Sequence, residues 1–335
     1  GSAVDPGTRF GGSSGGAITA LSAYAISSNE YSGILHTSSQ KETPFLNETV
    51  YSKTLNDLQN TMGSRYSPAS PCEGLDLVTA EEGKSVFIGK PCDVAAIYKH
   101  RQTNVILDEK IGITIGFFCA GTPSTKATKN LMKKVGVSKL ANVVALKYRG
   151  QGWPGNWQVT YSDDNSEVSE ASLSYADSWG YLQKYRQWRC YICPDHTGEF
   201  ADISVGDPWY KETSTEELGK SLIIARTERG QKFILDAVKA GYIQLDTMDN
   251  SLLPRSQPNL LNARGALWGR LLILRLFGAG VPNFIGFETF DFWMSELTLK
   301  EKAQSIYGTA KRVFTKRLTK RMPIQNGQKA KSNQK

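Results

Sequence analysis

The sequence is poor in the residues from which disulfide frameworks, histidine-rich metal sites and membrane spans are built. Its 335 residues include five cysteines and three histidines. The odd number and uneven spacing of the cysteines exclude a disulfide framework and indicate a reducing compartment. No uninterrupted apolar stretch reaches the roughly 18 residues that a spanning helix needs. The first residues show no secretory signal. We therefore expect a cytoplasmic protein.

Charge is scarce in the body of the chain and concentrated at its end. The net charge is +8 at pH 7, but residues 309–335 hold nine basic residues and no acidic one, which leaves residues 1–308 with a net charge of −1. A nearly neutral body argues against nucleic-acid binding, because a binding face would need basic residues spread over the fold.

The basic end predicts an amphipathic helix from residue 299 onward. Such a helix could bring the protein to the periphery of an anionic membrane or to an acidic partner such as an electron carrier. Residues 325–335 have the composition of a flexible, solubilising end. The apolar residues at helical spacing are Ala303, Ile306, Ala310, Val313 and Phe314.

The middle of the chain repeats one pattern twice. Strand-like residues 85–88 are followed by a cysteine and a helical pattern over 93–99, and strand-like residues 111–118 by a cysteine and a helical pattern over 125–135. Two consecutive units of this kind predict neighbouring parallel strands. We expect an α/β fold with a mixed, partly parallel sheet and flanking helices, followed by a helical, basic C-terminal tail.

Four of the five cysteines stand where they could converge on one metal centre. Cys92 and Cys119 follow the two predicted strands, each directly before a helix, and Cys190 and Cys193 form a Cys-x-x-Cys pair in a predicted turn. Ligands gather at the carboxyl edge of parallel strands, and a helix amino terminus favours the thiolate. The fifth, Cys72, looks structural or incidental.

Three interpretations of this cysteine pattern remain open. Structural zinc sites usually use two close pairs of ligands, whereas only one pair is close here. Iron–sulfur clusters accept more scattered cysteines, which favours a 4Fe-4S cluster. Alternatively, Cys92 and Cys119 are buried core thiols, since free cysteine is a common core residue.

A glycine-rich segment precedes the helical pattern over residues 17–26. It reads Gly-Gly-Ser-Ser-Gly-Gly over residues 11–16, with the hydroxyls of Ser13 and Ser14 at its centre. Glycines let the backbone approach an anion, and a helix amino terminus favours negative charge, so the segment is a candidate phosphate cradle. A flexible linker explains the same composition.

Several segments together resemble the beta subunit of coenzyme F420-reducing hydrogenase and its dehydrogenase relatives. The most specific is Cys-x-x-Cys followed by Ala201-Asp202-Ile-Ser-Val-Gly, over residues 190–206. Pro91-Cys92 and Cys119 match the family's other two cluster cysteines in order and context. Three further segments resemble flavin-proximal positions of the family: Gly15-Gly16 with Thr19, Gly63-Ser64-Arg65-Tyr66, and Arg149-Gly150-Gln-Gly152.

This resemblance implies an iron–sulfur flavoprotein oxidoreductase. It would pass electrons between a 4Fe-4S cluster, on Cys92, Cys119, Cys190 and Cys193, and FAD. Its partners would be a ferredoxin-like carrier or an upstream iron–sulfur domain on one side, and a hydride carrier such as coenzyme F420 or a small organic substrate on the other. The candidate flavin-binding residues are Ser13, Ser14, Gly15, Gly16, Thr19, Gly63, Ser64, Arg65, Tyr66, Lys90, Arg149, Gly150 and Gly152.

The resemblance also suggests how the chain is divided. We expect a flavin-proximal domain over residues 1–82, an iron–sulfur and flavin domain over 83–257, and the helical region over 258–335. Many relatives carry an upstream ferredoxin-like segment, which this sequence does not contain. A zinc-stabilised binding module without flavin is the alternative function.

Single residues near these motifs allow plainer interpretations. Lys90 could tune the cluster or hold an anionic edge of the flavin, or it could be a solvated lysine in a turn. Trp153 alone would be explained by packing, and Asp202 and Asp207 by capping and turn hydrogen bonds. His196 could relay a proton near the cluster cysteines.

Overall fold

A computed structural model describes residues 1–162, 167–210 and 218–320. The chain divides into two compact units. The first unit comprises residues 1–191 and 195–260, and the second comprises residues 192–194 and the chain from residue 261 onward. The predicted flexible end at residues 325–335 lies outside the described residues.

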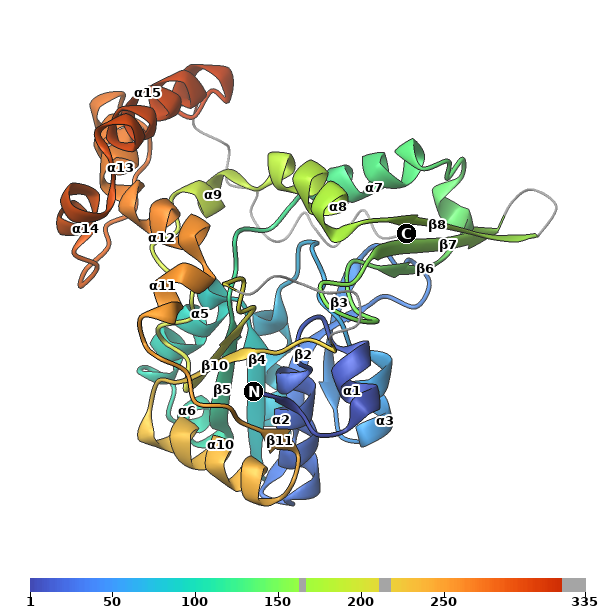
Figure 1. Ribbon diagram of the computed structural model, residues 1–335. Helices are drawn as coiled ribbons and strands as arrows, with labels where there is room; N and C mark the ends of the chain where they lie inside the picture. Colours follow the sequence, from blue (N-terminus) through green and yellow to red (C-terminus); the bar gives the residue numbers. More distant parts are fainter. Residues whose placement is uncertain (163–166, 211–217, 321–335) are drawn as a thin grey trace. The chain divides into compact units, whose positions relative to one another are not determined.

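The first unit is built on a mixed sheet with the strand order β10-β9-β5-β4-β2-β3 (Figure 1). Neighbouring strands from β9 to β2 are parallel, and the edge strands β10 and β3 are antiparallel to their neighbours. The prediction of a mixed, partly parallel sheet is confirmed. The strands are β2 (Tyr31–Ser39), β3 (Asn47–Ser52), β4 (Lys84–Gly89), β5 (Ile111–Phe117), β9 (Ile203–Gly206) and β10 (Leu222–Ala225).

Helices cover both faces of this sheet, which is why its central strands are almost continuously apolar. Alternate residues serve opposite faces: Val86 of β4 joins the core beneath α2 (Ala17–Ser27) and α10 (Glu228–Lys239). Its neighbour Phe87 joins the core beneath α5 (Pro91–Arg101) and α6 (Val105–Lys110). The predicted strand–cysteine–helix pattern at β4, and the parallel pairing of β4 with β5, are therefore confirmed.

A second, antiparallel sheet of the first unit has the order β6-β7-β8. It packs with α7 (Thr125–Lys134) and α8 (Tyr175–Leu182) around the buried Tyr148 and Trp157. The loop over residues 149–155 separates β6 from β7. The three strands are β6 (Val143–Lys147), β7 (Trp157–Ser162) and β8 (Val168–Leu173).

Short elements connect these layers. Strand β1 pairs with β11, so the start of the chain lies beside residues 243–244. The short elements are β1 (Ser2–Ala3), α1 (Pro6–Gly11), α3 (Leu55–Asn60), η1 (Pro71–Gly74), α4 (Leu75–Thr79), η2 (Leu140–Asn142), η3 (Gln183–Tyr185), α9 (Trp188–Tyr191), β11 (Ile243–Gln244), α11 (Leu252–Ser256) and α12 (Pro258–Gly265).

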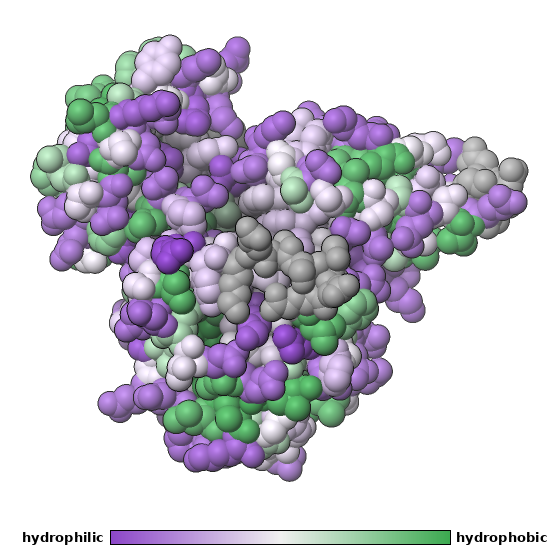
Figure 2. Space-filling view, viewed as in Figure 1, coloured by the Kyte–Doolittle hydropathy of each residue, from purple (hydrophilic) through white to green (hydrophobic). Residues whose placement is uncertain are grey.

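The second unit is helical, with α13 (Leu267–Leu276), α14 (Thr289–Glu296) and α15 (Leu299–Thr315). Gly269 lets α13 and α15 approach closely, because a Cβ there would lie 2.4 Å from the Ser305 Oγ. Hydrophobic and hydrophilic residues lie side by side on this unit (upper left in Figure 2). Within the described chain, no helix has the length and apolar character needed to cross a bilayer.

The predicted helix from residue 299 is confirmed, but its expected apolar face is buried only in part, with Ile306 and Ala310 half-buried. Helix α15 buries Ser305, Thr309 and Val313, whereas Ala303 and Phe314 are exposed. Small and hydroxyl-bearing side chains occupy the buried side because α13 lies so close at Gly269. The sequence pattern could not indicate this proximity, which depends on a residue of another helix.

Candidate functional site

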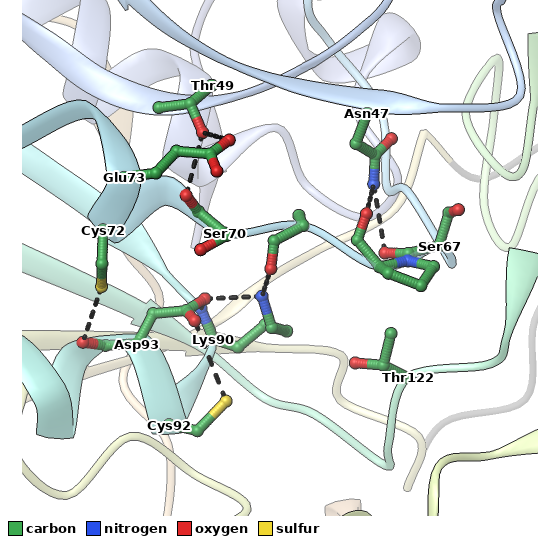
Figure 3. Close-up of polar contacts among 12 residues, drawn as sticks. Asn47, Thr49, Ser67, Ser70, Cys72, Glu73, Lys90, Cys92, Asp93 and Thr122 are labelled. Atoms are coloured by element: carbon green, nitrogen blue, oxygen red, sulfur yellow. Dashed lines mark hydrogen bonds and ion pairs between the residues drawn. The ribbon is translucent and has the colours of Figure 1, made fainter. Parts of the chain in front are cut away.

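Cys92 is the second residue of α5 and follows the end of β4 after Lys90 and Pro91, at the carboxyl edge of the sheet. It is exposed, which contradicts its interpretation as a core thiol. Beside it, the Lys90 ammonium forms an ion pair with Asp93 at 2.6 Å and donates to the Ala69 carbonyl at 3.1 Å (Figure 3). The Lys90 side chain is only 14% exposed, so the solvated-lysine interpretation is wrong. Cys72 lies nearby, with its Sγ 3.7 Å from the Asp93 carbonyl.

Cys119 follows β5 by two residues, at the same edge of the sheet. Its amide donates to the His196 carbonyl and its carbonyl accepts from the His196 Nδ1, both at 2.9 Å. The expected helix does not follow at once, because α7 begins only at Thr125. The prediction of a helix terminus at Cys119 is therefore wrong. A loop carries the thiol instead, and buried His196 fixes the backbone of that loop.

Cys190 lies in the short helix α9 rather than in the predicted turn. The amide of Thr122 lies 3.3 Å from its Sγ and donates to it. An isolated β-bridge between Pro123 and Arg186 holds the loop after Cys119 beside the segment before α9. The Arg186 guanidinium completes this link by donating to the Ala120 carbonyl at 2.7 Å.

The thiols of Cys92, Cys119 and Cys190 lie in one neighbourhood. Burial is the main cause that raises the pKa of the Cys119 thiol to about 12, and the charges of Cys92 and Cys190 contribute to the rise. Among residues 1–162, 167–210 and 218–320, no group of three or more His, Cys, Asp and Glu side chains is already arranged to hold a metal ion. Cys193 belongs to the second unit, so its convergence with the other three stays a prediction.

The structure brings together the three segments that the sequence proposed for the flavin. The Ser13 hydroxyl accepts a hydrogen bond from the Ser64 amide at 2.5 Å. The Gly152 amide donates to the Phe10 carbonyl at 3.0 Å. A Cβ on Gly63 would lie 3.0 Å from the Arg149 carbonyl. Residues 10–16, 63–66 and 149–155 therefore form one assembly within the first unit.

The glycine-rich segment is folded, which makes the linker interpretation wrong. Gly15 and Gly16 are buried, and Gly16 has φ +70°, a conformation that glycine adopts without strain. The Gly15 amide donates to the Ser221 Oγ at 2.9 Å, and the Ser14 hydroxyl donates to the Lys220 carbonyl. Helix α2 begins directly after Gly16 without a side-chain cap. Thr19, in its first turn, is half-buried.

Arg149 is buried in a two-pronged ion pair with Asp207, at 2.8 and 3.0 Å. Burial lowers the pKa of the Arg149 guanidinium, but Asp207, Tyr66 and Tyr175 together outweigh this effect and leave that pKa raised. The Arg149 Nε also donates to the Pro154 carbonyl at 2.8 Å, and the Trp153 indole donates to Asp207 at 3.2 Å. The pair therefore fixes the backbone of the loop that carries Gly150 and Gly152.

The role of Asp207 was missed, since the sequence assigned it to turn hydrogen bonding. Asp202 differs from that expectation too: its carboxylate accepts from the Thr114 amide at 2.8 Å and from Arg229 at 2.8 Å. The sequence signal for an acidic partner was Arg149 itself, because a buried guanidinium needs a carboxylate to balance its charge. Which carboxylate it was could not be inferred, since 58 residues separate the partners.

Arg65 and Tyr66 have protein partners of their own. The Arg65 guanidinium bonds the Asn47 side chain at 2.6 Å and the Pro44 carbonyl at 2.6 Å. The Tyr66 hydroxyl accepts from Arg149 at 3.5 Å, and its ring packs on Trp179. These contacts hold the loop at residues 63–66 in place, and direct contact of either side chain with a flavin stays a prediction.

Comparison with known proteins identifies the family. Residues 83–251 match the family that comprises the C-terminal part of the coenzyme F420 hydrogenase/dehydrogenase beta subunit. Residues 1–75 match the family that comprises its N-terminal part. The chain belongs to the coenzyme F420 hydrogenase/dehydrogenase beta-subunit family. The resemblance found in the sequence is confirmed, and an electron-transferring oxidoreductase subunit is the function that this family supports.

Individual relatives support the same family assignment. The coenzyme F420 hydrogenase subunit beta of Methanococcus voltae is 24% identical over 248 residues, covering 70% of this chain and 79% of the relative. The F420-dependent formate dehydrogenase 1 subunit beta of Methanococcus maripaludis is 25% identical over 244 residues, covering 72% and 59%. The alternative of a zinc-stabilised binding module is not favoured by this family.

A solved structure shares the fold. A chain of the F420-reducing [NiFe] hydrogenase complex from Methanosarcina barkeri aligns with a TM-score of 0.64 at 21% identity. The alignment covers 84% of this chain and 94% of that one. At this identity the likeness establishes the fold alone, and the chemistry of the site is argued from the residues themselves.

Proposed function

We propose that this chain is an iron–sulfur flavoprotein that transfers electrons between a 4Fe-4S cluster and FAD, and from there to or from a hydride carrier of the coenzyme F420 type. The observation that carries the proposal is the gathering of Cys92, Cys119 and Cys190 from three separate segments at the carboxyl edge of the sheet. Parallel α/β sheets bind their ligands at that edge.

The donor set fits an iron–sulfur cluster better than a zinc ion. All four candidate ligands are cysteines, and thiolates are the usual ligands of such clusters. Cys119 and Cys190 are held by the bridge between Pro123 and Arg186. Cys92 is placed by the start of α5. Cys193 would supply the fourth ligand.

The assembly of residues 10–16, 63–66 and 149–155 fits the diphosphate of FAD. Helix geometry leaves the first amides of α2 without a partner inside the helix, and no side chain caps them. Uncapped amides and the positive end of a helix dipole favour phosphate oxygens. Ser13, Ser14 and the loop carrying Gly150 and Gly152 would line the same place, fixed by Arg149 and Asp207.

The two groups would divide the chemistry. When bound, FAD supplies exchange between single electrons and hydride, which a cluster alone does not provide. The residues of this chain would hold and orient the two groups. Arg149 and Asp207 fix the loop that carries Gly150 and Gly152, and Lys90 with Asp93 fixes the backbone beside Cys92. Buried Phe87, Val94 and Ala201 exclude water from the core beneath α5.

The proposed partners are other subunits of an oxidoreductase complex, since the named relatives are beta subunits of hydrogenases and formate dehydrogenases. A ferredoxin-like carrier, or an iron–sulfur domain that precedes this sequence, would deliver the electrons. We propose cytoplasmic placement with peripheral attachment to the membrane, and no nucleic-acid partner.

The test is the visible spectrum and the iron, zinc and flavin content of protein purified without oxygen. We expect about four iron atoms per chain, as one 4Fe-4S cluster requires, together with bound FAD. Cys190→Ser should lose the iron. Cys72→Ser is the matched control: this thiol is half-buried and lies near Cys92, but it is outside the proposed ligand set. It should keep the iron.

Activity provides the second measurement. Protein holding both groups should reduce coenzyme F420 with a chemically reduced viologen dye, and Cys190→Ser should not. A colourless protein holding about one zinc ion per chain, as a site of four cysteine ligands does, would contradict the proposal. So would iron that survives Cys190→Ser and is lost with Cys72→Ser.

A further inference from the structure

The carboxyl-terminal ends of α13 and α15 expose a group of apolar side chains that we call the apolar end: Leu276, Phe277 and Phe314. Their exposed fractions are 71%, 41% and 67%. The rings of Phe277 and Phe314 meet edge to face, with centroids 5.2 Å apart. Large apolar side chains that touch one another while facing water indicate an interaction surface.

The two helices run in the same direction, which brings their carboxyl ends together. Gly269 of α13 lies beside Ser305 of α15, and a little more than two turns later Phe277 lies beside Phe314. Helix α14 packs against the opposite half of α13, through Trp293 and Trp268. The apolar end is therefore separated from α14 within this unit.

Every charged residue in the turns that flank the apolar end is basic. Residues 265–287 and 302–320 contain no aspartate or glutamate. The acidic residues of this unit occur only from residue 288 to residue 301, on α14 and at the start of α15. The flanking exposed cations are Arg275, Lys311, Lys316, Arg317 and Lys320.

Helix α15 continues this character along one exposed face. Tyr307, Lys311 and Phe314 stand at i, i+4 and i+7, so they share that face. Tyr307 and Phe314 are 74% and 67% exposed. Aromatic and basic residues on one helix face are typical of helices that lie in the boundary between lipid headgroups and acyl chains.

We propose that the apolar end docks on an anionic lipid bilayer. Phe277, Phe314 and Leu276 insert between the headgroups, and the flanking cations contact lipid phosphates. Charge complementarity favours an anionic bilayer as the occupant. The exposed apolar side chains are flanked only by positive charges, which attract the negative lipid headgroups. The inference rests on the peripheral attachment proposed above and assigns the surface that makes it, and its test is independent of the electron transfer and the cofactors.

The test is co-sedimentation of the full chain with vesicles. We expect binding to vesicles that contain phosphatidylglycerol, weak binding to vesicles of phosphatidylcholine alone, and release at high salt because the attraction is screened. The double variant Phe277→Ser/Phe314→Ser should weaken binding at least roughly tenfold, since two apolar side chains no longer insert. Lys311→Glu/Lys316→Glu should weaken it at least as much.

The matched control is Met294→Ser/Leu299→Ser. These side chains are 50% and 84% exposed and lie on α14 and at the start of α15, beside the acidic residues. This variant should bind like the parent chain. Absence of binding to phosphatidylglycerol vesicles at low salt would overturn the proposal. Binding unaffected by Phe277→Ser/Phe314→Ser would overturn insertion, and a concentration-dependent dimer abolished by the same variant would reassign the surface to a second copy of this chain.

Discussion

At the scale of single residues, the buried ion pair between Arg149 and Asp207 fixes the loop that carries Gly150 and Gly152. The Arg149 side chain is 2% exposed and the Asp207 side chain 19%, so neither charge relies on water alone. The pair reaches from the second sheet to the segment after β9. Its geometry explains why a glycine-rich loop, which would otherwise be mobile, presents one backbone conformation.

Replacing Asp207 by alanine should therefore destabilise the fold severely. The guanidinium of Arg149 would stay buried without a counter-charge, which costs about 3–5 kcal/mol of unfolding free energy. Denaturant titration measures this change. Asp246→Ala is the matched control, because it breaks the exposed pair between Lys220 and Asp246 and should cost less than about 1 kcal/mol. Equal losses in the two variants would contradict the importance of burial.

His36 gives the fold a dependence on pH. Burial lowers the pKa of its imidazole from 6.5 to about 4, and the neutral ring contacts the Ser52 hydroxyl at 2.7 Å between β2 and β3. Below its unfolded pKa the unfolded chain takes up a proton that the folded chain does not. The stability is therefore complete above pH 6.5 and is lost as the pH falls toward 4.

Between about pH 7 and about pH 5 this group should remove about 2 kcal/mol of unfolding free energy. The measurement is denaturant unfolding at both pH values for the parent chain and for His36→Gln. The variant should lose less stability over this interval than the parent does. Substitution of the exposed His100 by glutamine should leave the parent's pH dependence intact. Identical pH dependence in His36→Gln would refute the assignment.

At the scale of elements, the segment before α9 positions two of the candidate ligands. Arg186 donates to the Ala120 carbonyl and lies over the Tyr191 ring at 5.0 Å, so it spans the loop that carries Cys119 and the helix that carries Cys190. Without it, the backbone bridge and the Thr122 amide would still link the two segments.

Arg186→Ala should lower the unfolding free energy of the metal-free chain by about 1–3 kcal/mol. It should also make the Cys190 thiol react faster with a thiol reagent. Lys184→Ala is the control: Lys184 is an exposed cation in the same segment, and its loss should change neither quantity. If Arg186→Ala matches the parent in both, the guanidinium does not position these elements.

The sequence predicted those elements that depend on neighbouring residues and missed those that depend on distant segments. The parallel pair β4 and β5, with Cys92 soon after β4, followed from local order alone, because apolar runs and the residues that end them are neighbours in the chain. The pairing of Arg149 with Asp207, the helix around Cys190 and the buried face of α15 depend on distant segments. Local patterns do not contain that information.

At the scale of the whole molecule, hydrogen bonds between protein groups hold the segments of the proposed flavin site together. The Ser64 amide is bonded to Ser13, and the Gly152 amide to Phe10. By contrast, helix geometry leaves the amides of residues 17–19, at the start of α2, without acceptors inside the helix. A ligand that binds only the folded chain stabilises most strongly the groups that it contacts.

This difference predicts that flavin removal changes the hydrogen-exchange rates of only a few amides at the start of α2. If the flavin is removed from the full chain, amides 17–19 should exchange faster, whereas the amides of Ser64 and Gly152 should change little because their acceptors are protein atoms. Peptides from α10, on the same unit, provide the reference. Faster exchange across residues 10–16, 63–66 and 149–155 together would mean that the loops become ordered only on binding, which the hydrogen bonds described above argue against. No change at residues 17–19 would place the phosphates elsewhere and separate the assembly from the cofactor.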